Sequence, residues 1–546
     1  MSQKILVAVA WPYASGPRHL GHLAGAYLPA DILARYHRLA GNDVLMVSGS
    51  DVHGTPITVR ADEEGVDPQV IVDRYHKQFV DDWDRLDISW DIYTSTGTRN
   101  HADVTQDFFL KLLENGYLEK QTSSQYFDED AQRFLPDRYV EGTCPHCGYT
   151  QARGDQCDNC GRTLDVTDLI DPRSKLSGAT PIQRETEHFF LMLSRLEDRL
   201  KEWLESREGW RKHVRNWALG MIEEGLPDRA ITRDINWGVE IPVDDLGPGK
   251  RIYVWFDAVI GYLSASIEWA REQGDPEAWK AWWTDPEARS YYIVGKDNIP
   301  FHAVIWPGML IGYGGLNLPT DVPANQYVTF GSEKASASRG VGRSIDWYLD
   351  RLQTDALRFA VASVLPEQND TDLSDAEIIR RVNEELVATW GNLVNRVLTV
   401  TSRNFDGSVP AAGDLSDGDS SLLTAVDDAL DAAQRQLESI ELRAALRTML
   451  AAATDVNAYL NAEEPWKVVK KDPSRAATIL WVAIQAISGI RVGMAPYIPD
   501  STATLGTTFG LPTVPDGWSR PEVVAGTALG DINPLFTKLE ANVLDD

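Results

Sequence analysis

The sequence predicts an α/β fold in which a parallel-sheet domain is interrupted by an insertion and followed by a helical domain. Residues 1–115 alternate strand-like apolar runs with helical periods, the pattern of βαβ units. Residues 116–229 lose that rhythm and contain all four cysteines of the chain. The α/β pattern returns near residue 230, and residues 376–500 are almost entirely helical in period. These changes of pattern predict where the domains meet.

Individual elements follow from the same periodicities. In the first domain we expect strands at 4–10, 43–49 and 90–93, and helices at about 20–40, 67–85 and 102–115. After the insertion we expect buried strands at Ile252–Trp255 and Tyr291–Val294. Turn-forming runs at 406–410 and 414–421 separate two helical blocks. The predicted domains are therefore 1–115 and 230–329 (the two sheet halves), 116–229 (the insertion), 330–375 (a connecting segment) and 376–546 (helices and tail).

Composition limits the possible functions. The 546 residues carry a formal charge of −29, which argues against binding a polyanion through bulk charge. A nucleic-acid partner would need local basic patches, such as Arg211–Arg215 or Lys467–Lys471. No run of 18 or more apolar residues and no signal pattern is found, so we expect no membrane partner and a cytoplasmic location.

The first strand leads directly into the most informative motif of the chain. The run Ile5–Ala10 ends in a Gly/Pro turn, and a helix is predicted to begin near His19. A helix N-terminus suits a phosphate, and His19 and His22 lie on the same side of its first turn. Gly21 leaves room for a flat ligand to approach closely. The motif therefore predicts a nucleotide site at this end of the sheet.

The cysteines form two matched pairs. Cys144 and Cys147 are followed, after nine residues, by Cys157 and Cys160, and a glycine follows each pair. Four thiolates suit one tetrahedral Zn²⁺ ion with no open position, so the predicted site is structural. Two disulfides or a redox pair are the alternatives.

His19-Leu20-Gly21-His22 after such a strand resembles the HIGH motif of class I aminoacyl-tRNA synthetases. Further motifs resemble the methionyl-tRNA synthetase family over nearly the whole chain. The resemblance implies a Rossmann-like catalytic domain, an inserted connective domain with a zinc knuckle, and a C-terminal α-helical anticodon-binding bundle. It also implies a monomer that forms methionyl-AMP from L-methionine and ATP with Mg²⁺, and transfers methionine to tRNA(Met).

The resemblance assigns the ATP site. Its catalytic residues are His19, His22, Lys334 and Arg233, and ATP contacts fall on Gly21, His19, His22, Asp297, Lys334, Ser336 and Ser338. Lys334–Gly340 corresponds to the KMSKS loop, whose lysines grip the leaving phosphates. Ala337 stands where the family has the second lysine, so one cationic donor is missing, and Arg339 or Arg343 is the candidate replacement.

The amino-acid and anticodon sites follow from the same resemblance. The methionine-site positions are Trp11, Tyr13, Asp51, Trp255, Ala258, Tyr262, Phe301 and His302. A carboxylate such as Asp51 can pair with a substrate ammonium, and aromatic walls suit a thioether. The family's readers of the CAU anticodon correspond to Asn392, Arg396 and Trp466.

Two other functions remain open at this point. One is a paralogue that adenylates an amino acid for a non-translational acceptor, as in N–N bond-forming biosynthesis, and the change at Ala337 keeps it open. The other is a noncatalytic tRNA-binding regulator, which retention of His19, His22 and Lys334 disfavours. Which amino acid is the natural substrate is also open.

Overall fold

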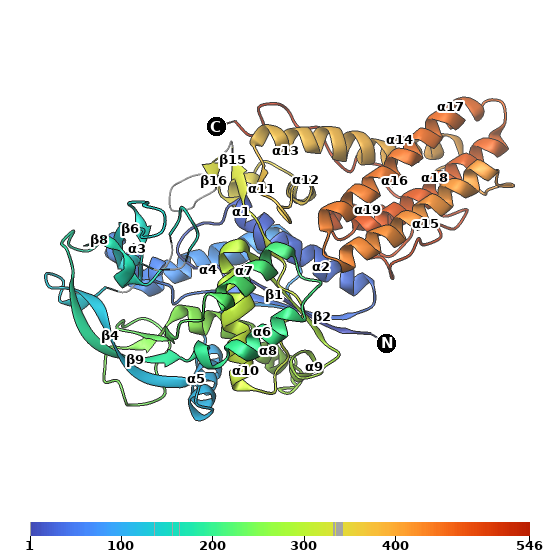
Figure 1. Cartoon of the computed structure of the whole chain (residues 1–546). Coiled ribbons are helices and arrows are strands. Elements are labelled where there is room, and N and C mark those ends of the chain that lie inside the picture. Colours follow the sequence, from blue (N-terminus) through green and yellow to red (C-terminus); the bar gives the residue numbers. More distant parts are fainter. Residues whose placement is uncertain are drawn as a thin grey trace.

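The computed structural model describes residues 2–135, 137–154, 157–162, 164–330, 333–334 and 342–545. Three regions are distinguished in Figure 1: a central α/β region, an insertion on one side, and an elongated helical bundle on the other. Ser336, Ala337, Ser338 and Arg339, which belong to the predicted KMSKS-like loop, lie outside the described residues, as does the side chain of Lys334.

A five-stranded parallel sheet forms the centre of the α/β region. Its strand order is β14-β13-β1-β2-β3, and every neighbouring pair is parallel. The strands are β1 (Lys4–Val9), β2 (Asp43–Ser50), β3 (Ile92–Ser95), β13 (Arg289–Gly295) and β14 (Ala324–Asn325). β1 lies between strands from the two halves of the sequence, so the strand order reverses beside it. Such a switch point, at the carboxyl ends of the strands, is where ligands bind in open α/β sheets.

Helices cover the sheet because its strands are apolar on both faces. They are α1 (Leu20–His22), η1 (Leu23–Tyr27), α2 (Leu28–Leu39), α3 (Thr55–Glu64), α4 (Pro68–Arg85), α5 (Arg99–Glu114), α8 (Val254–Glu272), α9 (Lys280–Trp283), η6 (Phe301–Ile305) and α10 (Trp306–Tyr313). The first three form one continuous helical stretch with a π-helical turn inside it. The predicted strand at Ile252–Trp255 is wrong. Only β12 (Arg251–Ile252) is extended, and α8 begins at Val254, because the apolar run continues as a helix long enough to bury its face on the sheet.

The insertion is a mostly antiparallel unit. β4 (Leu118–Asp128) and β9 (Ile182–Leu191) form a long ribbon, flanked by β5 (Arg133–Phe134) and β10 (Arg229–Ala230). β6 (Val140–Thr143), β7 (Ala152–Arg153) and β8 (Ile170–Ser174) make a second small sheet around the cysteines. Helices α6 (Glu197–Glu205) and α7 (Lys212–Glu223) then return the chain to the central region.

A connecting segment leads to the bundle. It contains β15 (Val328–Phe330), β16 (Glu333–Lys334), β17 (Thr371–Asp372), α11 (Ile345–Leu349), α12 (Thr354–Ala362), α13 (Asp375–Arg381) and η8 (Val382–Gly391). The bundle comprises α14 (Asn392–Asn404), α15 (Asp417–Glu438), α16 (Leu442–Glu463), α17 (Pro465–Val468), α18 (Pro473–Met494) and α19 (Pro499–Thr508). The break between the helical blocks is shorter than predicted, because α15 already begins at Asp417, capped by Ser416.

Helix α18 is the centre of the bundle. It is long and apolar enough to cross a membrane by length and composition, but 94% of its most apolar window is buried among the other helices. α15, α16 and α18 pack against one another, and their apolar side chains belong to the same core as α2 and α12. The hydropathy of α18 is thus explained by burial in a soluble-type core.

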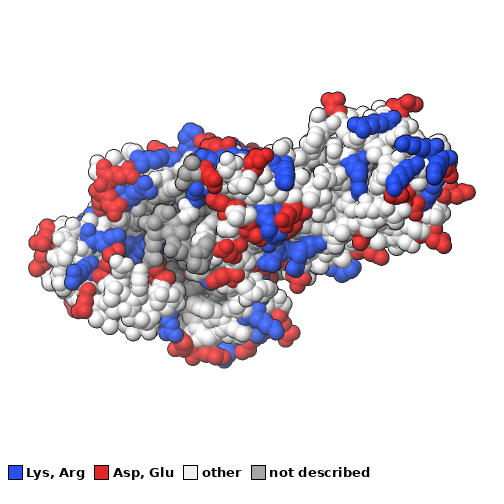
Figure 2. All heavy atoms as spheres, turned by 90° about the horizontal axis from the view of Figure 1, so that it is seen from above, with Lys and Arg blue, Asp and Glu red and all other residues white. Residues whose placement is uncertain are grey.

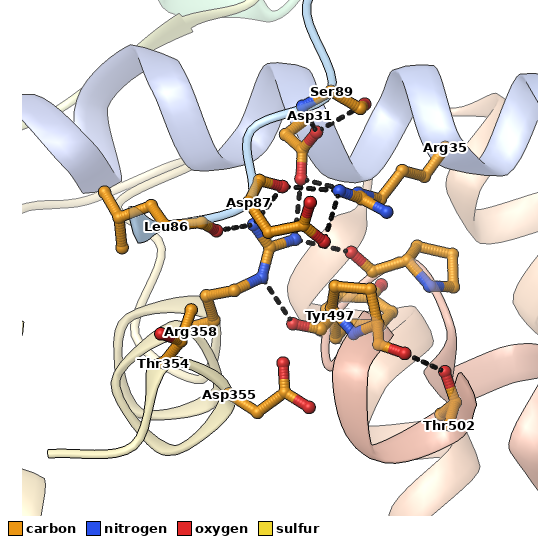
Figure 3. Close-up of polar contacts among 12 residues, drawn as sticks. Asp31, Arg35, Leu86, Asp87, Ser89, Thr354, Asp355, Arg358, Tyr497 and Thr502 are labelled. Carbon is orange, nitrogen blue, oxygen red and sulfur yellow. Dashed lines mark hydrogen bonds and ion pairs between the residues drawn. The ribbon is translucent and has the colours of Figure 1, made fainter. Parts of the chain in front are cut away.

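A buried ion pair joins the sheet region to the bundle (Figure 3). Arg358 of α12 is fully buried and donates to Asp31 of α2 at 2.6 Å. The same guanidinium donates to the carbonyls of Leu86, Pro496 and Tyr497, each at 3.0 Å. One side chain therefore ties helix α2 of the sheet region to the α18–α19 junction.

Candidate active site and tRNA-binding elements

A cavity of about 360 Å³ lies at the switch point between β1 and β13. Segments that follow β1, β2 and β13 converge on it, together with the start of α8. Among its lining residues are eleven predicted site residues: Trp11, Tyr13, His19, Gly21, His22, Asp51, Trp255, Ala258, Tyr262, Asp297 and His302. The fold thus brings the predicted nucleotide and amino-acid positions together in one space.

The two histidines are oriented by the backbone of their own turn. His19 is the N-cap of α1, and its Nδ1 accepts the N–H of Gly21 at 3.1 Å. Nδ1 of His22 accepts the N–H of His19 at 3.3 Å. Since Nδ1 of His19 accepts, the neutral ring carries its proton on Nε2, whereas Nε2 of His22 lies beside the Arg18 guanidinium. The rings lie 3.8 Å apart, so they stand side by side at the start of a helix, where an anion is favoured.

Arg18 adds a cation that the sequence reasoning missed. It lines the cavity, and its Nη1 lies 3.5 Å from Nε2 of His22. Burial lowers the pKa of the Arg18 guanidinium, and the side chain is held by the Gly16 carbonyl and the ring of Phe79. The sequence offered one signal for this role, because Arg18 immediately precedes His19 in the motif.

Trp11 fills the inner side of the cavity because two glycines make room for it. A Cβ at Gly49 would lie 2.2 Å from the Trp11 ring, and one at Gly261 would lie 2.7 Å from it. Backbone of β2 and α8 can therefore approach the indole from two sides. Tyr13 is held in register with Asp51 by a parallel backbone bridge.

Asp51 is the carboxylate at the amino-acid end of the cavity. It is 2% exposed, and its Oδ1 accepts the N–H of His53 at 3.0 Å. Burial and the nearby carboxylate of Asp257 raise the pKa of Asp51 well above its usual range. A buried carboxylate with this environment is stabilised by a cationic ligand.

Tyr262 and His302 form a self-satisfied polar pair. His302 Nδ1 donates to the carbonyl of Asn298 at 3.0 Å, and the Tyr262 hydroxyl donates to His302 Nε2 at 2.7 Å. Burial lowers the pKa of His302 to about 4, so the ring is neutral near pH 7. The pair keeps its strongest donors occupied and offers a side chain such as a thioether a weakly polar wall.

Trp255 and Phe301 form a partition between this cavity and a larger one. Their rings stack at 3.7 Å with an interplanar angle of 9°. Trp255 lines both spaces, whereas Phe301 and Arg233 line the neighbouring cavity of about 650 Å³. The Arg233 guanidinium lies 3.9 Å from the Tyr253 ring and donates to the carbonyl of Ala230. Arg233 is thus beside the histidine cavity and not in it.

The nucleotide end carries Asp297 immediately after β13. Its carboxylate accepts from the hydroxyl of Tyr327, which also lines the cavity and has Lys296 3.7 Å from its ring centre. Sequence reasoning missed Tyr327, and no local signal marks it. Arg343, a candidate replacement for the missing loop lysine, donates to Asp375 and to the Leu544 carbonyl, so it is engaged outside the cavity.

The four cysteines come together in the insertion. All four Sγ atoms lie within 4.8 Å of one another, and no disulfide joins them. The Sγ separations are 3.9 Å for Cys144–Cys160 and 3.5 Å for Cys147–Cys157. Tetrahedral zinc with bonds of about 2.3 Å requires about 3.8 Å between sulfurs. The residues therefore fit a structural Zn²⁺ ion, whose bonds would stabilise a subdomain with a very small core of its own.

The predicted anticodon residues also meet. Arg396 lies one turn after Asn392 on α14, and its guanidinium lies 5.2 Å from the Trp466 ring. Asn457 and Asn461 of α16 accept from Arg396 at 2.8 and 3.0 Å. Lys and Arg side chains gather over this end of the bundle (Figure 2). Arg211, predicted as part of a basic patch, is half-buried and donates to Asn325 and the Ala324 carbonyl, so its guanidinium is engaged within the protein.

Comparisons with known proteins agree with this architecture. Residues 5–398 match the family described as tRNA synthetases class I (M), and residues 409–543 match the anticodon binding domain of methionyl tRNA ligase. Fold and site therefore define a class I aminoacyl-tRNA synthetase, an ATP-dependent ligase.

Full-length relatives narrow the class. The chain is 51% identical to a methionine–tRNA ligase of Dehalococcoides mccartyi over 548 residues, covering 100% of this chain and 99% of the relative. It is 50% identical to that of Roseiflexus castenholzii over 580 residues, covering 100% and 98%. The chain belongs to the methionyl-tRNA synthetase family. The structure of the Mycobacterium tuberculosis enzyme in complex with methionyl-adenylate is similar, with 25% identity, a TM-score of 0.81, and coverage of 98% of this chain and 100% of that one.

Proposed function

We propose that this chain is a methionine–tRNA ligase that forms methionyl-AMP and transfers methionine to tRNA carrying the CAU anticodon. The observation that carries the proposal is the single cavity lined by both histidines, Asp51 and the Tyr262–His302 pair. The relatives named methionine–tRNA ligase support the choice of amino acid and acceptor. The reaction needs a carboxylate brought to the α-phosphorus of ATP and stabilisation of the charge that develops there.

At the nucleotide end, His19 donates through Nε2 to phosphate oxygens, and the His22 ring lies beside it at the same helix start. Gly21 leaves the helix start open, and Asp297 faces the ribose. Lys334, Ser336 and Ser338 of the KMSKS-like loop complete the phosphate contacts. Mg²⁺ bound to ATP would supply neutralisation of the phosphate charge. Arg233 acts from the neighbouring cavity, on the other side of the Trp255–Phe301 partition.

At the amino-acid end, Asp51 pairs with the ammonium group of methionine. Trp11, Tyr13, Trp255 and Ala258 supply the apolar walls, and Phe301 stacks against Trp255 from the other side. Tyr262 with His302 faces the thioether. A fully polar side chain would lose its water there without gaining free donors, since those of the pair are occupied. This discrimination favours methionine over polar amino acids.

For tRNA, Asn392 and Arg396 contact splayed anticodon bases and Trp466 offers a stacking surface. Cys144, Cys147, Cys157 and Cys160 hold one structural Zn²⁺ ion in the insertion. The domains we propose are 1–115 and 230–329 for catalysis, 116–229 as the connective insertion, 330–375 for the loop and stem contact, and 376–546 for the anticodon. We propose a monomer that acts in the cytoplasm.

Amino-acid-dependent pyrophosphate exchange, measured with and without tRNA(Met), tests the proposal. Exchange that requires methionine, followed by charging of CAU tRNA, is the expected result. Exchange with another amino acid and no charging would favour the biosynthetic paralogue. Tight tRNA binding with no exchange for any amino acid would favour the regulator.

A further inference from the structure

Next to Asp51 the structure buries three ionisable side chains that the functions above do not use. They are His53 after β2, His101 of α5 and Asp257 of α8, exposed by 9%, 1% and 0%. Their ligand-type atoms lie within 4.8 Å of one another. The contact between His53 Nδ1 and Asp257 Oδ2, at 2.5 Å, is a hydrogen bond and leaves no room for an ion between these atoms. We therefore interpret the cluster as a hydrogen-bonded one.

His53 links two walls of the amino-acid cavity. Its backbone N–H donates to Oδ1 of Asp51, and its ring donates to Asp257. Asp257 lies in the first turn of α8, the helix that presents Trp255, Ala258 and Tyr262 to the cavity. The position of Asp51 relative to α8 is thus fixed through one histidine.

Asp257 keeps an unused acceptor in the interior. Its Oδ1 is buried and has no hydrogen-bond partner among the described residues. His101 is its second neighbour, with Nε2 3.8 Å from Oδ2, while Nδ1 of His101 contacts the Ser264 hydroxyl. A buried carboxylate left half satisfied is costly, so a compensating cation is expected nearby.

The charge of Asp257 depends on the ionisable groups around it and around Asp51. Asp51 is close to His53 on its own segment and to Asp257 and Tyr262 on α8. His101 of α5 lies next to Asp257, and Arg138 of the insertion lines the cavity. Burial would raise the pKa of Asp257, but His53 and His101 lower it further than burial raises it. Asp257 therefore stays ionised and adds its field to that of Asp51.

We propose that His53 and Asp257 are positioning residues for substrate binding: His53 holds Asp51 in place, and Asp257 supplies a second negative charge at the ammonium end of the cavity. The inference rests on the proposed function, because it assumes that Asp51 receives an amino-acid ammonium. His53 and Asp257 act through other residues, so a list of side chains that contact the substrate would not include them.

Three variants test it by methionine-dependent pyrophosphate exchange. His53→Ala should raise KM for methionine about tenfold or more, as expected for losing a hydrogen bond to a charged group, with KM for ATP unchanged. His53→Asn should restore most of the loss, because its Nδ2 can replace the ring Nδ1. Asp257→Asn removes a like charge from beside Asp51, so it lowers the pKa of Asp51 and moves the acid limb of kcat/KM for methionine to lower pH.

Two inhibitors distinguish a loss of ammonium binding at Asp51 from a general loss of structure in the cavity. L-Methioninol keeps the ammonium and lacks the carboxylate, whereas 4-(methylthio)butanoic acid lacks the ammonium. His53→Ala and Asp257→Asn should weaken inhibition by methioninol about tenfold and by the acid less than about twofold. His37→Ala removes another buried histidine, on α2 and hydrogen-bonded to Asn42, and should change neither constant.

Equal weakening of both inhibitors, or an Asp257→Asn acid limb that does not move, would overturn the inference. If His53→Ala does not fold, Asp257→Asn alone carries the test, because it preserves shape. Failure of the proposed function gives a different result: the wild-type protein itself would show no methionine-dependent exchange.

Discussion

Replacing Arg358 by methionine should uncouple the bundle from the catalytic region. Methionine keeps an unbranched apolar side chain of similar length, but removes a guanidinium that is 0% exposed. Three carbonyls, of Leu86, Pro496 and Tyr497, lose their donor, and Asp31 loses one of its two cations (Figure 3). Breaking a buried ion pair by removing one partner costs about 3–5 kcal/mol, a large part of a typical folding free energy.

The pKa of Asp31 determines how the loss of stability in Arg358→Met depends on pH. Burial raises the pKa of Asp31, but Arg35, Arg358 and Ser89 bring it down to about 2. A depressed carboxyl pKa contributes stability above the unfolded value near pH 4, and this is lost as pH falls toward 2. The shift corresponds to about 2 kcal/mol. In Arg358→Met the pKa of Asp31 rises, so acid destabilisation should begin at a higher pH than in the wild type.

Chemical unfolding followed by circular dichroism gives the stability change. Initial rates of pyrophosphate exchange and tRNA charging give the functional change. Because the proposed tRNA contacts lie at both the cavity and Trp466, charging should fall more than exchange. Arg351→Met, at an exposed residue whose guanidinium contacts the Trp347 carbonyl and ring, is the matched control and should cost at most about 0.5 kcal/mol. A loss below about 1 kcal/mol for Arg358→Met, or equal loss of exchange and charging, would refute the reasoning.

Three other predictions concern separate sites. Trp466→Ala should weaken charging of CAU tRNA by ~1–3 kcal/mol with adenylate formation little changed, and unaltered charging would remove its assignment. Purified protein should contain one zinc per chain, and Cys157→Ser should lower stability more than methionine affinity; two disulfides and no metal in elemental analysis would contradict this. Ala337→Lys should raise kcat for adenylation about tenfold and leave KM for methionine unchanged, a smaller effect than the ~10²–10³ in rate that one preorganised donor can contribute. Single-turnover rates of adenylate formation test this prediction. An unchanged rate would mean that another cation already acts there.

Local patterns predicted most of the parallel sheet and the residues around the cavity. β1 and its motif were readable because a buried parallel strand, a Gly/Pro turn and a capped helix are all specified within a few residues. The cysteine cluster was readable from spacing alone. The strand predicted at Ile252–Trp255 failed because β-prone residues there begin a helix whose burial outweighs their intrinsic preference.

Residues whose roles depend on partners far away in the sequence could not be predicted from the sequence. Arg211 looks like surface charge in the sequence, yet its environment comes from Asn325, more than a hundred residues away. Tyr327 reaches the cavity because β14 and β15 place it beside Asp297. His53 and Asp257 are 204 residues apart, and no periodicity relates them. Such pairs exist only once the sheet has formed.

This distinction bears on how the site works. The groups that we propose as substrate contacts lie in short motifs, since a strand end and a helix start position them with little help. The neighbours proposed to modulate them, such as Asp257 beside Asp51 and Asn457 beside Arg396, come from other elements. A substitution in a motif should therefore remove a step outright, whereas one in a tuning group should change affinity, pH dependence or selectivity while leaving the step in place. The inhibitor pair for His53 and Asp257 measures that difference directly.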